Sequence, residues 1–296
     1  MRFSYVVVAA LFFALSPHTQ AEQPLTIEKL LPASKRWRIE LGAVYATSDT
    51  TGVETQFEII QTGPTQFISI PTLMSEARRN SDIVVFTGGV RYGVTAETEL
   101  FGRVSGLIEN TRSTFLGESR TQRSERFADS RIGVNHLFVQ EGKTPALLGF
   151  AEVALIENTA LTGHDIAYGK SWLFGFTIYR TIDPVVLSAT ASYHVSIERR
   201  VNGQDQNPGD FLLVSPSVAF AVNNEITLAG GFQWRRKQAD KINGSARGIS
   251  TTAFDFSPGL AYIWSKRLTL FLDTRLNISG DSGVQVGLTG LYKLGK

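Results

Sequence analysis

Charged side chains recur at every second position within several otherwise apolar segments of this chain of 296 residues. In an extended strand, this spacing places the charges on one face and the apolar residues on the other. Arginine, lysine and carboxylate side chains that share an enclosed face can set the ion preference of a watered passage or pair with one another. The candidates for such a pore lining are Arg38, Glu40, Arg91, Glu99, Arg103, Glu109, Arg131, Glu152, His194, Arg235, Asp255, Asp273, Arg275 and Lys293.

The basic and acidic members of this set nearly balance, so the sequence leaves both roles open. The charges either line a narrow watered passage or pair across the interior and fill it. A barrel of about twelve strands lies between the eight-stranded size that side chains fill and the sixteen-stranded size that leaves a wide channel.

Histidine is the residue type that most directly suggests catalysis, and residues 22–296 hold three: His136, His164 and His194. His194 lies two residues from Ser192 and Ser196, but strand alternation alone places serines on that face. No Asp or Asn is positioned in sequence to orient the imidazole, so we predict no enzyme activity. Cysteine is absent, and no histidine pair or Asp-rich loop has ligand spacing, so no metal or cofactor site is predicted.

These residues lie in segments in which apolar and polar residues alternate. The segments are joined in turn by very short connections and by long polar ones. The long connections are predicted over 48–81, 111–127, 158–170, 198–209 and 238–248. This rhythm is typical of a transmembrane antiparallel up-and-down β-barrel, which turns tightly on the periplasmic side and carries long loops outside. The predicted strands span 37–47, 82–92, 98–110, 130–139, 146–157, 171–181, 185–197, 210–222, 226–237, 251–264, 268–278 and 284–294.

A soluble all-β sandwich or propeller would also alternate, but two features favour the membrane barrel. The predicted strands run to roughly 11 residues, which is the length that a tilted membrane strand needs. Polar residues occupy the second face of nearly every strand, and a dry core could not pair all of them.

The N-terminus has the pattern of an export signal. Residues 1–21 combine Arg2, a short apolar run and a cleavage site after Ala21. The domain prediction is therefore a signal peptide over 1–21, a periplasmic segment over 22–36 and an outer-membrane barrel over 37–296. An even number of strands places both termini in the periplasm of a Gram-negative cell.

The segment 22–36 has two interpretations. Its apolar residues could form a short helix that ends at Pro32 and docks in the lumen as a plug or gate. Alternatively, it is a loose leader before the first strand. If it is a plug, deletion of 22–34 should raise the conductance.

Composition excludes several other classes. The net charge of +2 indicates no nucleic-acid partner. The absence of cysteine excludes a lipoprotein anchor and a disulfide scaffold, and no later run is long and apolar enough for a helical span. The predicted partners are outer-membrane lipid and a transported molecule; a homo-oligomer is left open.

Residues 89–100 read Gly-Val-Arg-Tyr-Gly-Val-Thr-Ala-Glu-Thr-Glu-Leu. This strand end, short turn and new strand resemble the outer-membrane family named after the meta-pathway of phenol degradation, whose members are assigned as transport barrels. The architecture is also similar to that of the functional-amyloid secretion channel, a twelve-stranded barrel with a longer N-terminal extension. These resemblances imply transport or export.

We therefore predict an outer-membrane channel or transporter for passive passage of small molecules or for export of a secreted polypeptide. The alternative is a non-conducting structural or adhesive barrel, whose long loop 48–81 would bind a partner outside the cell.

Overall fold

The computed structural model describes residues 34–51, 57–71, 78–115, 118–159, 165–201, 203–279 and 282–295. The predicted signal peptide and all but the last three residues of the segment 22–36 lie outside these ranges. Within the described ranges, no helix has the length and apolar character to cross a membrane.

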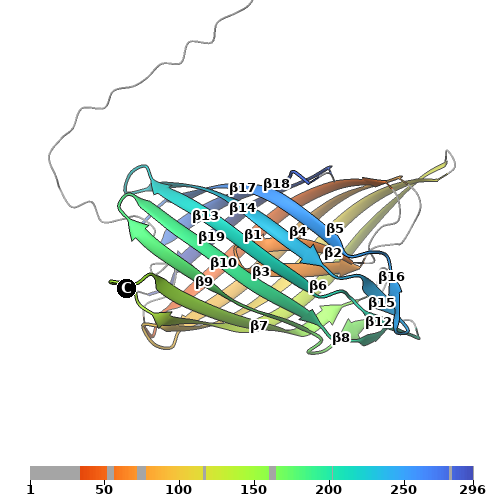
Figure 1. Cartoon of the computed structure of the whole chain (residues 1–296), viewed down its shortest axis with the longest axis horizontal. Helices are drawn as coiled ribbons and strands as arrows, with labels where there is room; N and C mark the ends of the chain where they lie inside the picture. The colour runs from red at the N-terminus through yellow and green to blue at the C-terminus, as the bar shows by residue number, and fades with distance from the viewer. Residues whose placement is uncertain are drawn as a thin grey trace, which may run out of the picture.

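Twelve long strands form one closed antiparallel β-barrel (Figure 1). They are β1 (Trp37–Thr51), β4 (Arg78–Gly93), β5 (Thr98–Phe115), β6 (Glu118–Val139), β7 (Ala146–Asn158), β9 (Ser171–Ile182), β10 (Val185–Ser196), β13 (Phe211–Ala221), β14 (Ile226–Lys237), β17 (Thr251–Ile263), β18 (Leu268–Asn277) and β19 (Ser282–Lys293). The ring closes because β1 pairs with β19 on one side and with β4 on the other. The predicted barrel of about twelve strands is confirmed.

The outer face of the barrel is apolar. Leu41, Phe86 and Leu288 are each more than half exposed there, and their strand neighbours of opposite parity point inward. Side chains of this kind cannot remain in water over a whole barrel surface, so this face lies in lipid.

The two ends of the barrel differ in their connections. At the turn end, β4–β5, β6–β7, β9–β10, β13–β14 and β17–β18 are joined by short connections, and β1 begins and β19 finishes there. At the loop end, the connections β1–β4, β7–β9, β10–β13 and β14–β17 are longer and contain short strands, whereas only two residues separate β5 from β6 and four separate β18 from β19. Apart from the connection between β5 and β6, this distribution of short and long connections is the one predicted from the sequence.

One predicted loop is wrong. Residues 111–127 are mostly strand, because β5 continues to Phe115 and β6 begins at Glu118, with pairs such as Arg112↔Thr121. This hairpin projects at the loop end (Figure 1). Both of its faces carry polar residues, so no apolar alternation marks it as a strand in the sequence.

Short strands also occupy three other predicted loops. The segments 198–209 and 238–248 contain β11 (Arg199–Val201), β12 (Gln204–Asn207), β15 (Asp240–Ile242) and β16 (Ser245–Arg247), which form a separate four-stranded sheet. Within 158–170, β8 (Ile166–Ala167) pairs with the end of β7. The irregular pattern predicted over 146–157 has a cause, since the β6–β7 register shifts where Leu155 is left without a partner.

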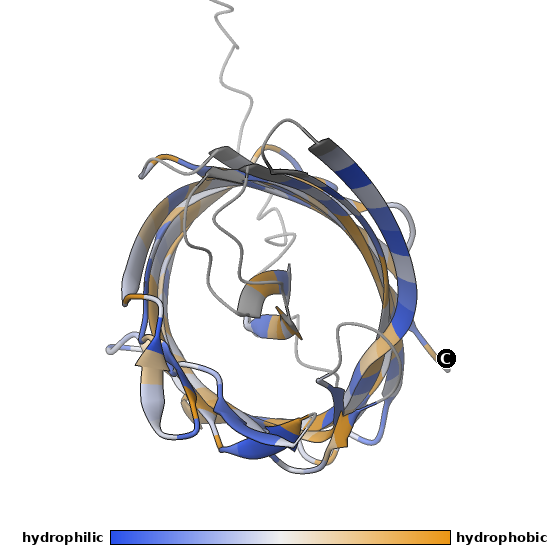
Figure 2. Ribbon diagram, turned by 90° about the vertical axis from the view of Figure 1, so that its right-hand side faces the viewer, coloured by the Kyte–Doolittle hydropathy of each residue, from blue (hydrophilic) through white to orange (hydrophobic). Residues whose placement is uncertain are grey.

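The first loop departs furthest from its prediction. Instead of forming an outer loop throughout, 48–81 contains a hairpin of β2 (Phe57–Gly63) and β3 (Gln66–Pro71). Figure 2, a view along the barrel, shows this hairpin inside the ring of strands. The inside of the barrel therefore holds a folded element that the sequence did not predict there.

Candidate functional site: the lumen, its hairpin and its two walls

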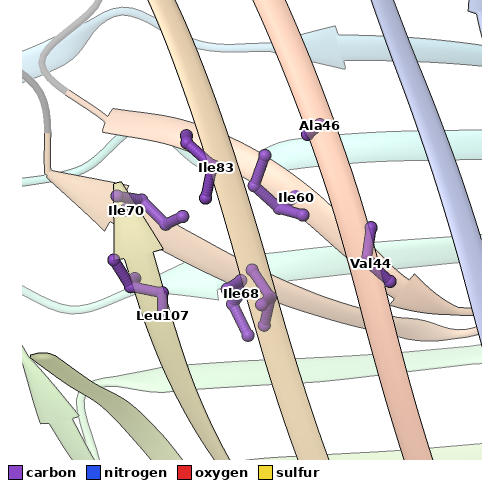
Figure 3. Packing of buried hydrophobic residues seen from close by; sticks show 8 residues of the cluster. Val44, Ala46, Ile60, Ile68, Ile70, Ile83 and Leu107 are labelled. Atoms are coloured by element: carbon purple, nitrogen blue, oxygen red, sulfur yellow. The ribbon is translucent and has the colours of Figure 1, made fainter. Parts of the chain in front are cut away.

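One apolar face of the lumenal hairpin packs against β1, β4 and β5. Ile60, Ile68 and Ile70 are at most 1% exposed and form one cluster with wall residues (Figure 3). The wall members of this cluster are Val44, Ala46, Ile83, Val85 and Leu107. These wall positions face inward, so apolar residues on the lumen side mark the footprint of the hairpin.

The opposite face of the hairpin packs across the lumen. Ile59 and Phe67 form a second cluster with Phe150 of β7, Leu173 of β9, and Phe211 and Leu213 of β13. The rings of Phe67 and Phe211 meet edge to face, with their centroids 5.4 Å apart. The hairpin thus bridges the lumen between two apolar patches on opposing walls.

Polar bonds also tie the hairpin to β1 and β5. Arg103 donates from Nη1 to the Thr62 hydroxyl at 2.9 Å and from Nη2 to the Phe67 carbonyl at 3.2 Å. The Gln66 amide donates to the Glu40 carboxylate at 3.2 Å. Because Arg103 is only 4% exposed, these charge-assisted bonds are shielded from water.

Three more side chains reach the hairpin from the other side. The Gln61 side-chain oxygen accepts a hydrogen bond from Gln233 at 2.8 Å and another from Arg275. Arg235 donates to the Ile59 carbonyl at 3.3 Å. These contacts come from β14 and β18 and hold β2 near its tip.

Glu40, Arg91, Glu99, Arg103, Asp129, Arg131, Glu152 and Glu157 form what we call the charged wall, on β1 and β4–β7. At its turn end, Arg91 donates to Glu40 at 2.5 Å and to Glu99 at 2.6 Å, and Asn135 donates to Glu99 at 2.7 Å. Glu99 is fully buried, so a charge there requires these partners.

The charged wall continues toward the loop end through shared carboxylates. Glu152 accepts from Arg103 at 2.9 and 3.1 Å and from Arg131 at 3.2 Å. Arg131 also donates to Asp129 at 2.5 Å and reaches Glu157 at 3.5 Å. The charged wall therefore holds two groups of ion pairs, one around Arg91 and one around Arg103 and Arg131, which together we call the lattice. Arg199 of β11 adds a contact to Glu157 at 3.4 Å.

The opposite side of the lumen is lined by small residues. The set that we call the small-residue wall comprises Ser188, Thr190, Ser215, Ser217, Ala219, Thr227, Ala229, Gly231, Ser257, Gly259, Ala261, Gly287 and Thr289. Its hydroxyls bond to near neighbours, as in Ser188 with Ser217 at 2.7 Å. Short side chains leave space beside the wall, and Ala229 remains exposed although it points inward.

A cavity of about 420 Å³ lies between this wall and the tip of the hairpin. Residues 61–66 of the hairpin border it, with β18 contributing Phe271, Asp273 and Arg275. Toward the turn end it is bordered by apolar side chains such as Leu148 and Leu291. Its size falls in the range of small-molecule pockets.

The predicted lining residues lie in several different surroundings. Glu40, Arg91, Asp273 and Arg275 border the cavity. Glu99, Arg103, Arg131 and Glu152 lie in the lattice; Glu109 is buried and paired with Arg126. Asp255 lies 3.9 Å from Arg275, and Arg235 donates to the hairpin. Arg38 of β1 and Lys293 of β19 are partners in the strand register. That they line a pore remains a prediction.

The sequence reasoning did not identify the hairpin or the small-residue wall. The apolar inward residues Val44, Ile83 and Val85 were the available signal for the hairpin, because such residues have no reason to face a watered lumen. Runs of Ser, Thr, Ala and Gly on one face of five strands could have indicated the small-residue wall.

The histidine with a serine on each side has a packing role. His194 is 3% exposed and stacks on Phe211 with ring centroids 4.6 Å apart. Its Nδ1 lies 3.4 Å from the Ser196 hydroxyl. His164 lies outside the described residues. Across the residues that the structure covers, no group of three His, Cys, Asp or Glu side chains could hold a metal ion.

Solved structures with the same fold are bacterial membrane barrels. An outer-membrane channel from Pseudomonas putida F1 aligns with 89% of this chain and 97% of its own length, at 10% identity and a TM-score of 0.63. The translocator domain of the autotransporter NalP from Neisseria meningitidis aligns at 8% identity and 0.54, covering 89% of this chain and 90% of its own. No protein-family model and no curated protein matches the sequence. These likenesses show the barrel fold of outer-membrane proteins.

Proposed function

We propose that this protein is an outer-membrane channel for passive passage of small molecules, with the lumenal hairpin as a fixed constriction. The observation that carries the proposal is the asymmetry of the lumen. The hairpin packs between two apolar patches and is bonded to Arg103 and Glu40 of the charged wall, and the remaining space lies along the small-residue wall. Solutes would pass between that wall and the hairpin tip.

The strength of the anchoring favours a fixed element over a swinging gate. Five hairpin side chains, Ile59, Ile60, Phe67, Ile68 and Ile70, are between 0% and 7% exposed. Burial of a large apolar side chain contributes about 1.5–3 kcal/mol, so full displacement into water would cost on the order of 10 kcal/mol. At about 1.4 kcal/mol per factor of ten, fewer than roughly one molecule in a million would have a displaced hairpin.

This cost also weighs against the other predicted roles. An exported polypeptide would need the space that the hairpin fills. An adhesive surface on 48–81 would need that loop outside, whereas its described central part, 57–71, is inside the barrel. Small molecules are the cargo that the geometry supports best.

Single-channel conductance in planar bilayers tests the proposal. We expect the refolded mature protein to conduct steadily. Replacement of 57–71 by a short Gly-Ser linker should raise the conductance several-fold, because the lumen of a twelve-stranded barrel is then cleared. Silence from both forms, with each barrel shown to be folded, would refute a channel. A parallel deletion of 22–34 tests separately whether the N-terminal segment also obstructs the lumen.

A further inference from the structure

One acidic side chain of the lumen differs from the others in its exposure. Asp273 of β18 is exposed where it borders the cavity. Among the described residues, no basic group lies within ion-pair distance of its carboxylate. The other acids of the predicted lining and of the charged wall are at most 8% exposed; they are Glu40, Glu99, Glu109, Asp129, Glu152, Glu157 and Asp255.

Two glycines keep the space around this carboxylate open. In the strand register, Asp273 has Gly259 of β17 on one side and Gly287 of β19 on the other. A Cβ atom at Gly259 would lie 3.1 Å from Asp273 Oδ1, which is closer than an ordinary van der Waals contact. The carboxylate therefore lies over a position that has no side chain, and a solute in the cavity can approach it.

The basic side chains near the cavity are bound to other groups. Arg275, two residues from Asp273 on the same strand, donates to Gln61 of the hairpin and lies 3.9 Å from Asp255. Arg91 donates to two carboxylates of the charged wall, and Arg235 donates to a hairpin carbonyl. The accessible charge at the cavity is therefore the negative charge of Asp273, which attracts cations and repels anions.

The surroundings of Asp273 favour an organic cation over a metal ion. Within the described ranges, no group of three His, Cys, Asp or Glu side chains could hold a metal ion, and a single carboxylate replaces little of the water around a small inorganic cation. Phe271, the next inward residue of β18, borders the same cavity, and aromatic rings attract organic cations. An ammonium ion that carries an organic group can contact both side chains.

We propose that Asp273 selects cationic solutes in the passage, with small organic ammonium ions as the preferred class. The inference rests on the proposed function and names the solutes that the channel favours. The ammonium group lies at the Asp273 carboxylate, and the organic part packs toward Phe271. Asp273 is thus a specificity-determining residue of the passage.

The reactivity of an introduced thiol tests this selection without requiring conduction. The native chain has no cysteine, and Ala261, the register partner of Phe271 on β17, borders the cavity. In the folded, detergent-solubilised Ala261→Cys barrel, a trimethylammonium and a sulfonate methanethiosulfonate reagent are compared, each rate being normalised to that of a free thiol. We expect the cationic reagent to react faster. Asp273→Asn should lower the ratio of the two rates about twofold to fivefold, since one charge is removed from a watered space.

The matched control is Asp205→Asn in the same Ala261→Cys background. It removes the same charge from an exposed site of β12 outside the cavity lining, so the ratio of rates should stay unchanged. Protection of the thiol from the neutral reagent methyl methanethiosulfonate tests the solute class. Benzylammonium should protect saturably and more strongly than potassium or benzoate at equal ionic strength, and Asp273→Asn should weaken this protection.

Each result has a defined meaning. An equal or faster reaction with the anionic reagent would overturn the inference, as would equal effects of the two Asp→Asn variants or a thiol that neither reagent reaches. Equal protection by benzylammonium and by potassium or benzoate would also overturn it. A barrel that conducts without this preference would overturn only the selection by Asp273. A folded, silent barrel whose thiol shows the preference would overturn only the channel.

Discussion

The two walls of the lumen differ in the length and charge of their polar side chains. The charged wall uses long side chains that form ion pairs with one another, at distances of 2.5–3.5 Å. The small-residue wall uses short hydroxyls and glycine, which need few partners and occupy little volume. The charged wall therefore contributes Arg103 and Glu40 to holding the hairpin, and the cavity lies along the small-residue wall.

Under the proposed function, most of the lumen charges lie away from the path of the solute. The ion pairs of the charged wall are mostly buried, and each arginine fixes the positions of the carboxylates that it binds. The side of the barrel with fewer charges is the one with space. Variants that change one wall and leave the other intact test this difference between the walls.

The largest effect is expected from Arg131→Met in the charged wall. This change leaves Asp129, Glu152 and Glu157 partly unpaired in a buried site, and the free energy of unfolding should fall by about 3–5 kcal/mol. Urea unfolding of the barrel in detergent measures it. Arg123→Met is the matched control, because the pair of Arg123 and Glu125 is more than 60% exposed on the projecting hairpin. That control should cost less than about 1 kcal/mol; equal losses would refute the lattice.

Next in size is the effect of Ala229→Phe in the small-residue wall. The ring would enter the cavity, and conductance should fall by about twofold or more, since flow depends on the open cross-section. Leu228→Phe is the control, because Leu228 is 46% exposed on the lipid-facing side of the same strand. An unchanged conductance in Ala229→Phe would place the passage elsewhere.

A smaller effect is expected from neutralising single acids on the two sides. Asp273 is exposed to the cavity, so Asp273→Asn should lower the cation-to-anion permeability ratio about twofold, as one charge in a watered space contributes about 1 kcal/mol or less. Glu99→Gln should leave this ratio unchanged, because Glu99 is buried beneath Arg91. Reversal potentials in a salt gradient measure both, and the reverse ranking would contradict the two-wall account.

The smallest effect is expected from Ser188→Ala. The serine contacts Ser217 at 2.7 Å beside a watered cavity, so water can replace the lost partner. The free energy of unfolding should change by less than about 1 kcal/mol, with conductance unaltered. A loss as large as that of Arg131→Met would show that the small-residue wall is also a stabilising lattice.

The sequence predicted the barrel because lipid imposes apolar residues on most outward positions of the barrel strands, such as Leu41, Phe86 and Leu288. It did not predict the extension of β5 and β6 around Arg112 and Arg123, since a hairpin in water carries polar residues on both faces. The inward hairpin was missed for a related reason. Ile60 and Ile68 fit an outer loop as well as a lumen, and only their contacts with Val44 and Ile83 distinguish the two. The pairing of Arg103 with Glu152 is equally non-local, since it depends on strand register across β6.

The central claim is that the hairpin is fixed while solutes pass beside it. The native chain has no cysteine, so Gln66→Cys with Glu40→Cys can be joined selectively by a short cleavable bis-thiol reagent at a contact now closed by a hydrogen bond of 3.2 Å. Single-channel conductance is then recorded on the linked protein and again after the link is cleaved. The fixed-constriction account predicts the same conductance before and after cleavage. Silence of the linked form, with conductance restored on cleavage, would show that the hairpin must move and would contradict the account.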